Sequence, residues 1–133
     1  ASAPLNISSM FWSWQAGYKF LRLDGRSSTA GGDPAVDGWR VHIGSTACDG
    51  DVRGNVTMCA NPNRPEITLT RFDASTQRII VDTGALLANA DLESNAEGTP
   101  EGCMGDPSDA DCTPILEALG LSDDATQTFF RVE

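Results

Sequence analysis

The chain has 133 residues, 40% of them hydrophobic, and a formal net charge of −10 at pH 7, which fits one domain with a real core. After residue 95, nine acidic side chains stand against one basic side chain, Arg131. An acidic surface repels nucleic-acid phosphates and anionic lipid head groups, so we expect neither as a partner. No apolar run approaches the roughly 20 residues of a membrane span, and we expect none.

An aromatic block lies near the start of the sequence, at residues 9–20. It holds two of the three Trp, the only Tyr and the only Lys. Met10, Trp12 and Trp14 fall on alternate positions, so an extended backbone would turn all three to one side. Two interpretations follow. The block forms a core wall, or its indoles and thioether form one wall of a soft-metal or redox pocket.

Two strands are predicted after this block. Residues 18–24 indicate the first, from the apolar and polar side chains of Tyr18 through Arg22, and residues 39–43 alternate again, with a turn-rich loop between them. In the second strand Trp39, Val41 and Ile43 share one side, while Arg40 and His42 share the other. Because Trp39 and His42 are three positions apart, they face opposite sides of a regular strand.

The four Cys form two local pairs, Cys48 with Cys59 and Cys103 with Cys112. Neither pair has the Cys-x-x-Cys spacing of a zinc ribbon or a thioredoxin-type motif. Three disulfide pairings are formally possible, and the local one is favoured because short loops close at the lowest entropy cost. Disulfides place the protein in an oxidising compartment, either the periplasm or the outside of the cell. We expect residues 48–65 to be one loop closed by its disulfide.

The second half of the chain predicts more strands and one helix. Residues 66–72 and 77–82 alternate on both sides of a short polar link, which indicates a hairpin. Residues 85–92 fit a short helix or a buried strand. Residues 113–120 predict a helix with Thr113 as N-cap and Gly120 as its end, and residues 129–132 a closing strand. The prediction is an all-β fold, a disulfide-stabilised β-sandwich with long loops and one short helix near the C-terminus.

Few catalytic constellations are present. A single His excludes a metal site with several histidines from this chain alone, and neither a Ser-His-Asp arrangement nor a phosphate loop stands out. Asp106, Asp109 and Asp111 resemble part of a calcium loop, but the sharp-turn Gly and the bidentate Glu are missing. A solvated acidic loop is the simpler interpretation.

The sequence resembles the MbnP-like, four-Cys "metallo-mystery pair" family over nearly its whole length. The resemblance rests on a set of motifs: Ser9-Met-Phe-Trp-Ser-Trp-Gln15, Gly17-Tyr-Lys-Phe20 with Arg22, Trp39-Arg-Val-His-Ile-Gly-Ser45, Cys59-Ala-Asn-Pro-Asn-Arg64, Gly102-Cys-Met104, and Cys48 and Cys112. Full-length family members are longer, with further strands before the aromatic block. We therefore expect a single domain over residues 1–133 that is the C-terminal part of a longer family-type domain, and an N-terminal companion segment or subunit.

The resemblance implies a periplasmic or secreted copper-binding protein that is not itself an enzyme. It also implies a MauG-like di-haem partner that oxidises a Trp, with kynurenine as the product. His42 would then be the imidazole ligand, and Trp14, Trp12 or Trp39 the oxidised residue, with Trp14 preferred. Trp12 and Trp14 would line the metal site, with thioether help from Met10 or Met104.

Two alternatives stay open. A non-metal structural or interaction subunit would keep the family fold without the metal site. An electron-transfer substrate would relay oxidising equivalents through its indoles and bind no copper.

Overall fold

The computed structural model describes residues 7–12, 18–26, 38–51 and 55–133. Its strands are β1 (Lys19–Asp24), β2 (Arg40–Gly44), β3 (Thr46–Gly50), β4 (Val56–Asn61), β5 (Ile79–Val81) and β6 (Phe130–Val132). Its helices are the 3-10 turns η1 (Ser8–Met10) and η2 (Ala110–Cys112) and the α-helices α1 (Thr83–Leu87) and α2 (Thr113–Ala118). In these parts of the chain no helix has the length and apolar character needed to cross a bilayer.

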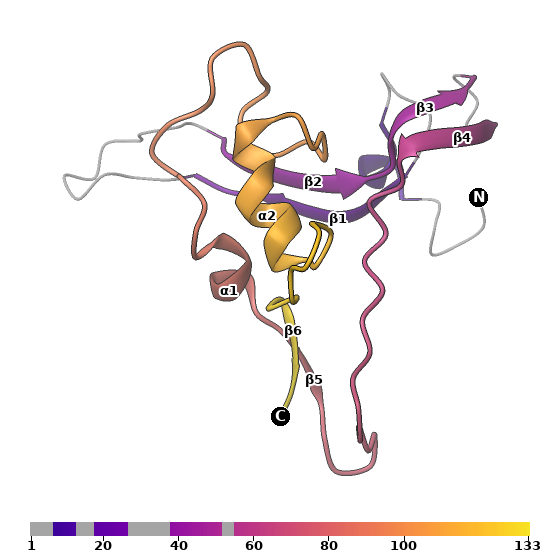
Figure 1. The fold of residues 1–133 in the computed structure, drawn as a ribbon, viewed down its shortest axis with the longest axis vertical. Coiled ribbons are helices and arrows are strands. Elements are labelled where there is room, and N and C mark those ends of the chain that lie inside the picture. The colour runs from indigo at the N-terminus through magenta and orange to yellow at the C-terminus, as the bar shows by residue number, and fades with distance from the viewer. Residues whose placement is uncertain (1–6, 13–17, 27–37, 52–54) are drawn as a thin grey trace.

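The described strands form three antiparallel pairs, β1 with β2, β3 with β4, and β5 with β6. Figure 1 shows α2 crossing the β1–β2 pair with α1 near α2, and the β3–β4 ribbon extending from one end of the pair. With two disulfides and little helix, the predicted disulfide-stabilised all-β class is confirmed.

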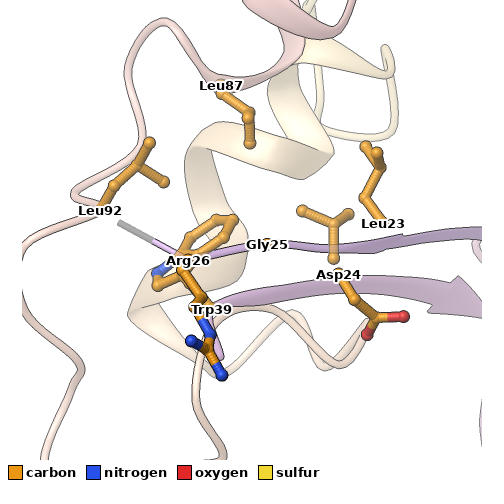
Figure 2. A pocket seen from close by; sticks show the side chains of 8 residues that line it. Leu23, Asp24, Gly25, Arg26, Trp39, Leu87 and Leu92 are labelled. Carbon is orange, nitrogen blue, oxygen red and sulfur yellow. The ribbon is translucent and has the colours of Figure 1, made fainter. Parts of the chain in front are cut away.

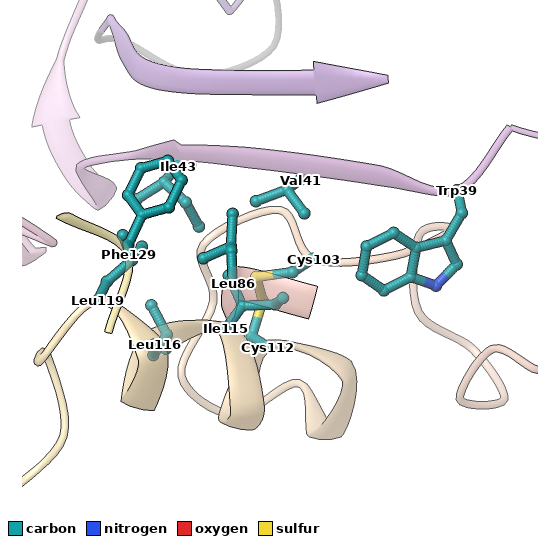
Figure 3. Packing of buried hydrophobic residues seen from close by; sticks show 10 residues of the cluster. All are labelled: Trp39, Val41, Ile43, Leu86, Cys103, Cys112, Ile115, Leu116, Leu119 and Phe129. Carbon is teal, nitrogen blue, oxygen red and sulfur yellow. A yellow bond between two sulfur atoms is a disulfide. The ribbon is translucent and has the colours of Figure 1, made fainter. Parts of the chain in front are cut away.

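The core lies between β2 and the helices. Val41 and Ile43 point from β2 toward Leu86 of α1 and Ile115 of α2, and each of the four is at most 1% exposed. Figure 3 also shows Trp39 at one end of this cluster and Phe129 at the other. The period-two pattern therefore identified the buried side of β2 correctly.

Both predicted disulfides are confirmed, Cys48 with Cys59 and Cys103 with Cys112. The second one is fully buried in the core and fastens the chain to β2. His42 N donates to Cys103 O at 2.8 Å, and Cys103 N donates to Arg40 O at 2.8 Å. This parallel bridge gives β2 a backbone partner on the edge away from β1.

Two predictions for the middle of the chain are wrong. Residues 48–65 are not a single loop, because β3 and β4 pair across the first disulfide, with Cys48 opposite Cys59. Residues 66–72 do not form a hairpin with residues 77–82, since β5 pairs with β6 instead. Alternation reports an extended backbone with one covered side, and it does not identify the neighbouring strand.

We call residues 64–72 the arm, because Figure 1 shows them as a long stretch that runs away from β4. Pro65, Ile67 and Leu69 are half-buried, and the residues between them are exposed. Among the described residues, none of the hydrogen bonds joins the arm backbone to another strand. The arm thus has the side-chain pattern of a strand without a partner strand.

The C-terminal predictions are largely confirmed. The ambiguous segment at residues 85–92 contains the end of α1, so its first part is helical. Helix α2 begins at Thr113, with Pro114 in its first turn and Cys112 rather than Thr113 as N-cap. Gly120, at φ +72°, ends this helical region as predicted. Strand β6 is the predicted closing strand.

Candidate functional site

A polar face lies on the side of the β1–β2 pair opposite the core. In the antiparallel register Arg22 lies across from His42, and Asp24 lies across from Arg40. Directly opposed residues of neighbouring strands point to the same face. Since Val41 and Ile43 point into the core, these four side chains point away from it.

A β-bulge adds Lys19 to this polar face. The register shifts between Lys19, which lies across from Gly44, and Leu21, which lies across from Ile43. Without the extra residue, Lys19 and Arg22 would point to opposite faces, being three positions apart. The bulge leaves Phe20 half exposed, whereas Lys19 is only 7% exposed.

The segment at residues 7–12 folds back over the polar face. The Tyr18 hydroxyl lies 3.1 Å from Ile7 N and 3.2 Å from Ile7 O. Arg22 Nη1 donates to Ser9 O at 3.0 Å, which fixes η1 beside β1. This cover is why a strand side that reads as polar in the sequence is partly removed from solvent.

The Trp12 indole packs over Gly44 at one end of the polar face. A Cβ at Gly44 would lie only 2.9 Å from Trp12 Cζ3, so only a glycine leaves room for the ring. Gly44 and His42 are two positions apart on β2 and share a face. Trp12, at 2% exposure, therefore lies on the same face as His42.

His42 is buried on this face, at 8% exposure, and its ring contacts Asp24. The distance from His42 Nε2 to Asp24 Oδ1 is 2.7 Å. Burial lowers the pKa of His42 below 6.5, and the charges of Lys19 and Arg22 lower it further, while Asp24 opposes the shift. The imidazole is therefore neutral at pH 7, the form that binds metals.

Asp24 is the acidic centre of the site. Arg22 Nε lies 2.5 Å from Asp24 Oδ2, and Arg40 Nε lies 3.9 Å from Asp24 Oδ1. Partial burial raises the pKa of this carboxyl, but the hydrogen bonds from His42 and Arg22 and the charge of Arg22 outweigh this effect. Its pKa consequently lies below the ordinary value, and Asp24 is ionised at neutral pH.

The structure separates two of the predicted indole candidates. Trp39 lies in the core, on the opposite side of β2 from His42, as the three-residue spacing predicts. Trp12 lies on the His42 side, and Met10 is half-buried in η1 beside β1. Trp14 falls outside the described residues, so the preference for it stays a prediction.

Other candidates lie elsewhere. Met104 lines a separate pocket beside β3, together with Asp106 and Asp109. Asp106 Oδ1 accepts hydrogen bonds from Ser108. Asp109 Oδ1 accepts one from Asp111 N, as a helix cap does. The calcium interpretation stays a prediction, and these bonds explain Asp106 as a turn residue and Asp109 as a cap residue.

The described residues do not supply a complete set of metal ligands by themselves. Within them, no group of three or more His, Cys, Asp or Glu side chains is placed to hold a metal ion. The polar face offers one imidazole and one carboxylate. Any metal bound at His42 needs further ligands from the rest of the polypeptide or from another chain.

A small apolar pocket of about 110 Å³ lies on the other side of β1, at the Trp39 end of the core. Figure 2 shows Leu23, Leu87 and Leu92 around it, with the Asp24 carboxylate directed away from Leu87 and Leu92. Trp39 Nε1 is buried there and has no hydrogen-bond partner among the described residues. The pocket is thus separated from His42 by the β1–β2 pair.

Asp24 is the site residue that sequence reasoning missed. The sequence pattern places it in a predicted strand and assigns it no role. The sequence does contain a signal for this role. Arg22 and Asp24 are two positions apart and share one side of their strand, as Arg40 and His42 do on the next strand. Only the register, which depends on the bulge, shows that these pairs meet.

Comparisons with known proteins point to one family. The family model named MbnP matches residues 1–105. The solved structure of MbnP from Methylosinus trichosporium is similar over 99% of this chain, with 32% sequence identity and a TM-score of 0.79. The match covers 52% of that MbnP chain, so the present chain spans about half its length. No match was found among curated proteins.

Proposed function

Because this chain belongs to the MbnP family, we propose that it is a copper-binding protein in which His42 is the imidazole ligand. The observation that carries the proposal is the state of His42. It is a buried, neutral imidazole on a face that the Trp12 indole covers at its Gly44 end. A neutral imidazole shielded from bulk water is a good ligand for copper.

The donor chemistry of the polar face fits copper in part. Imidazole nitrogen and thioether sulfur are ligands that copper accepts, and Met10 in η1 belongs to the segment over this face. Bound copper would supply a redox-active or Lewis-acidic centre at His42. The residues of this chain hold and orient the imidazole, and the remaining ligands come from outside the described residues.

The indole on the His42 face is the natural candidate for oxidation among the described Trp residues. Trp12 shares that face, whereas Trp39 is in the core on the other side. Following the family resemblance, the proposal includes a MauG-like di-haem enzyme as the oxidant. Peptide mapping of protein from its native source tests it, and kynurenine is expected at Trp12 or Trp14. Unmodified indoles at both positions would contradict this part of the proposal.

The proposal places the protein in the periplasm or outside the cell and gives it a binding role rather than an enzymatic one. All four Cys form disulfides, and disulfides persist in oxidising compartments. Fractionation of the native cells, followed by immunoblotting, tests the location. Recovery in the reducing cytoplasm would contradict it.

Copper titration tests the ligand assignment directly. The wild-type protein is compared with His42→Ala and with Arg78→Gln, a control at an exposed position outside the β1–β2 pair. We expect His42→Ala to lose the tight copper site and Arg78→Gln to keep it. Equal stoichiometry and affinity in all three proteins would remove His42 from the site.

A second candidate function is a structural or interaction subunit without metal. The absence of a closed ligand cluster among the described residues favours this candidate. Elemental analysis of the natively purified protein separates the two. Copper near one equivalent supports the first proposal, and its absence supports the second.

A further inference from the structure

We infer that Asp24 is a positioning residue that holds His42 in the Nε2–H tautomer and thereby makes Nδ1 the atom that binds the metal. The inference rests on the proposed function, since it concerns how the same imidazole meets copper. It adds a residue and a ligating atom, neither of which follows from the family membership. Its first test needs no metal.

The tautomer follows from the hydrogen bond between the two side chains. His42 Nε2 and Asp24 Oδ1 are 2.7 Å apart, so one proton lies between them. An ionised carboxylate only accepts hydrogen bonds. The proton therefore belongs to Nε2, and the lone pair of the neutral ring is left on Nδ1.

The surroundings of Asp24 keep it in this acceptor role. Arg22 donates to the second carboxylate oxygen, Oδ2, while Arg40 lies on the Oδ1 side. An arginine has no acceptor and keeps its charge, so both side chains favour the ionised carboxylate. The strand register holds these groups together, because Arg22 and Asp24 lie directly across from His42 and Arg40.

The backbone of His42 is fixed as well. Its N–H donates to Cys103 O at 2.8 Å, next to the buried Cys103–Cys112 disulfide. With the main chain held on one side and Nε2 held on the other, the ring has little freedom to rotate. A carboxylate that accepts from the second ring nitrogen of a metal-binding histidine is the usual way to fix its tautomer and orientation.

Metal binding through His42 Nε2 would require the hydrogen bond to Asp24 to break. A metal at Nε2 would displace the proton and leave Asp24 Oδ1 without its 2.7 Å donor. Binding through Nδ1 keeps every contact of Asp24 in place. The geometry therefore favours Nδ1.

The first experiment is a long-range ¹H–¹⁵N NMR correlation of the His42 ring in the metal-free wild-type protein at neutral pH. Because His42 is the only His, the signals need no assignment by mutation. We expect the pattern of the Nε2–H tautomer, with an unprotonated Nδ1. The Nδ1–H pattern would overturn the inference whether or not the protein binds copper.

The second experiment compares variants by the same NMR signature and by copper titration. Asp24→Ala removes the acceptor and should give a mixture of tautomers and roughly 10- to 100-fold weaker copper binding. Asp24→Asn keeps an acceptor oxygen and should retain the Nε2–H tautomer, with a smaller loss of affinity. Glu101→Gln is the matched control, since Glu101 contacts Arg40 at 3.4 Å but has no hydrogen bond to the His42 ring.

The outcomes separate this inference from the copper proposal. If His42→Ala binds copper as well as the wild type, the proposed function fails while the tautomer result stands. If Asp24→Ala keeps both the wild-type tautomer and the wild-type copper affinity, the positioning role of Asp24 fails. If Glu101→Gln changes both readouts as much as Asp24→Ala does, the effect belongs to the whole charge cluster, and the inference is also overturned.

Discussion

At Gly102 the chain next to the second disulfide lies against the edge of β2. Gly102 has φ +76°, and a Cβ there would collide with the carbonyl oxygen of Arg40. Gly98 has a similar φ of +82° but open space around its Cβ position. An added Cβ would therefore meet only backbone strain at Gly98, but both backbone strain and a steric collision at Gly102.

Alanine substitutions at these glycines should differ in cost. Gly98→Ala is expected to lower the free energy of unfolding by about 1–2 kcal/mol, the cost of a left-handed conformation. Gly102→Ala adds a collision with β2 and should cost roughly 3 kcal/mol or more in total. Urea unfolding of both variants measures the difference. Equal losses would show that the close approach of Gly102 to β2 adds nothing to the cost.

Asp109 predicts a pH dependence of stability. It is 5% exposed, and burial raises its pKa above 3.8, with Asp111 and Asp106 adding repulsion. An acid whose pKa is higher in the folded state binds its proton better when folded. Its contribution is therefore most favourable below pH 3.8 and is lost as the pH rises through the raised pKa.

Asp109→Asn should remove this dependence. The amide oxygen can still accept from Asp111 N, and no charge is buried, so the variant should be more stable than the wild type at pH 7. The advantage should shrink toward pH 3. Melting temperatures of both proteins across this range check the prediction, and a constant difference at all pH values would contradict it.

At the scale of elements, the two disulfides close sequence separations of similar length, 11 and 9 residues. If loop entropy alone mattered, the two disulfides would contribute nearly equally to the free energy of unfolding. They differ in burial, because Cys103 and Cys112 are at 0% exposure in the core, whereas Cys48 and Cys59 are half-buried on the β3–β4 ribbon. Core packing should therefore make the Cys103–Cys112 disulfide contribute more to stability than the Cys48–Cys59 disulfide.

Replacing each pair by two alanines tests this comparison. Either replacement should cost about 2–4 kcal/mol from the lost cross-link. The Cys103/Cys112 replacement should cost a further 1 kcal/mol or so, because it leaves space in the core. Thermal unfolding of the two double variants gives the order, and a larger loss for Cys48/Cys59 would contradict it.

The elements also show what the sequence could predict. The alternation in β2 correctly separated Trp39 from His42, since it depends only on backbone geometry. The alternation could not predict which residues lie across from Asp24, because the bulge at Lys19 sets the register between β1 and β2. The predicted hairpin of residues 66–72 with residues 77–82 is wrong, because β5 pairs instead with β6, which lies far along the chain.

At the scale of the whole molecule, the arm is a strand-like segment without a described partner. Backbone groups without hydrogen bonds in a protein exchange their amide protons quickly. Amides of residues 66–70 should therefore exchange at nearly the rate of an unfolded peptide, while His42 N, bonded to Cys103 O, should be strongly protected. Hydrogen-exchange mass spectrometry of the chain measures both. Protection of the arm would show that another strand pairs with it in solution.

The arm also decides how the chain responds to a protease. Arg71 is exposed at the end of the arm, and neither disulfide spans it, since one closes residues 48–59 and the other residues 103–112. Cleavage by trypsin after Arg71 would thus leave two covalently separate fragments. The hydrogen bonds between β2 and Cys103 join those fragments at the edge of β2. A nicked molecule should consequently elute as one species under native conditions and as two in denaturant.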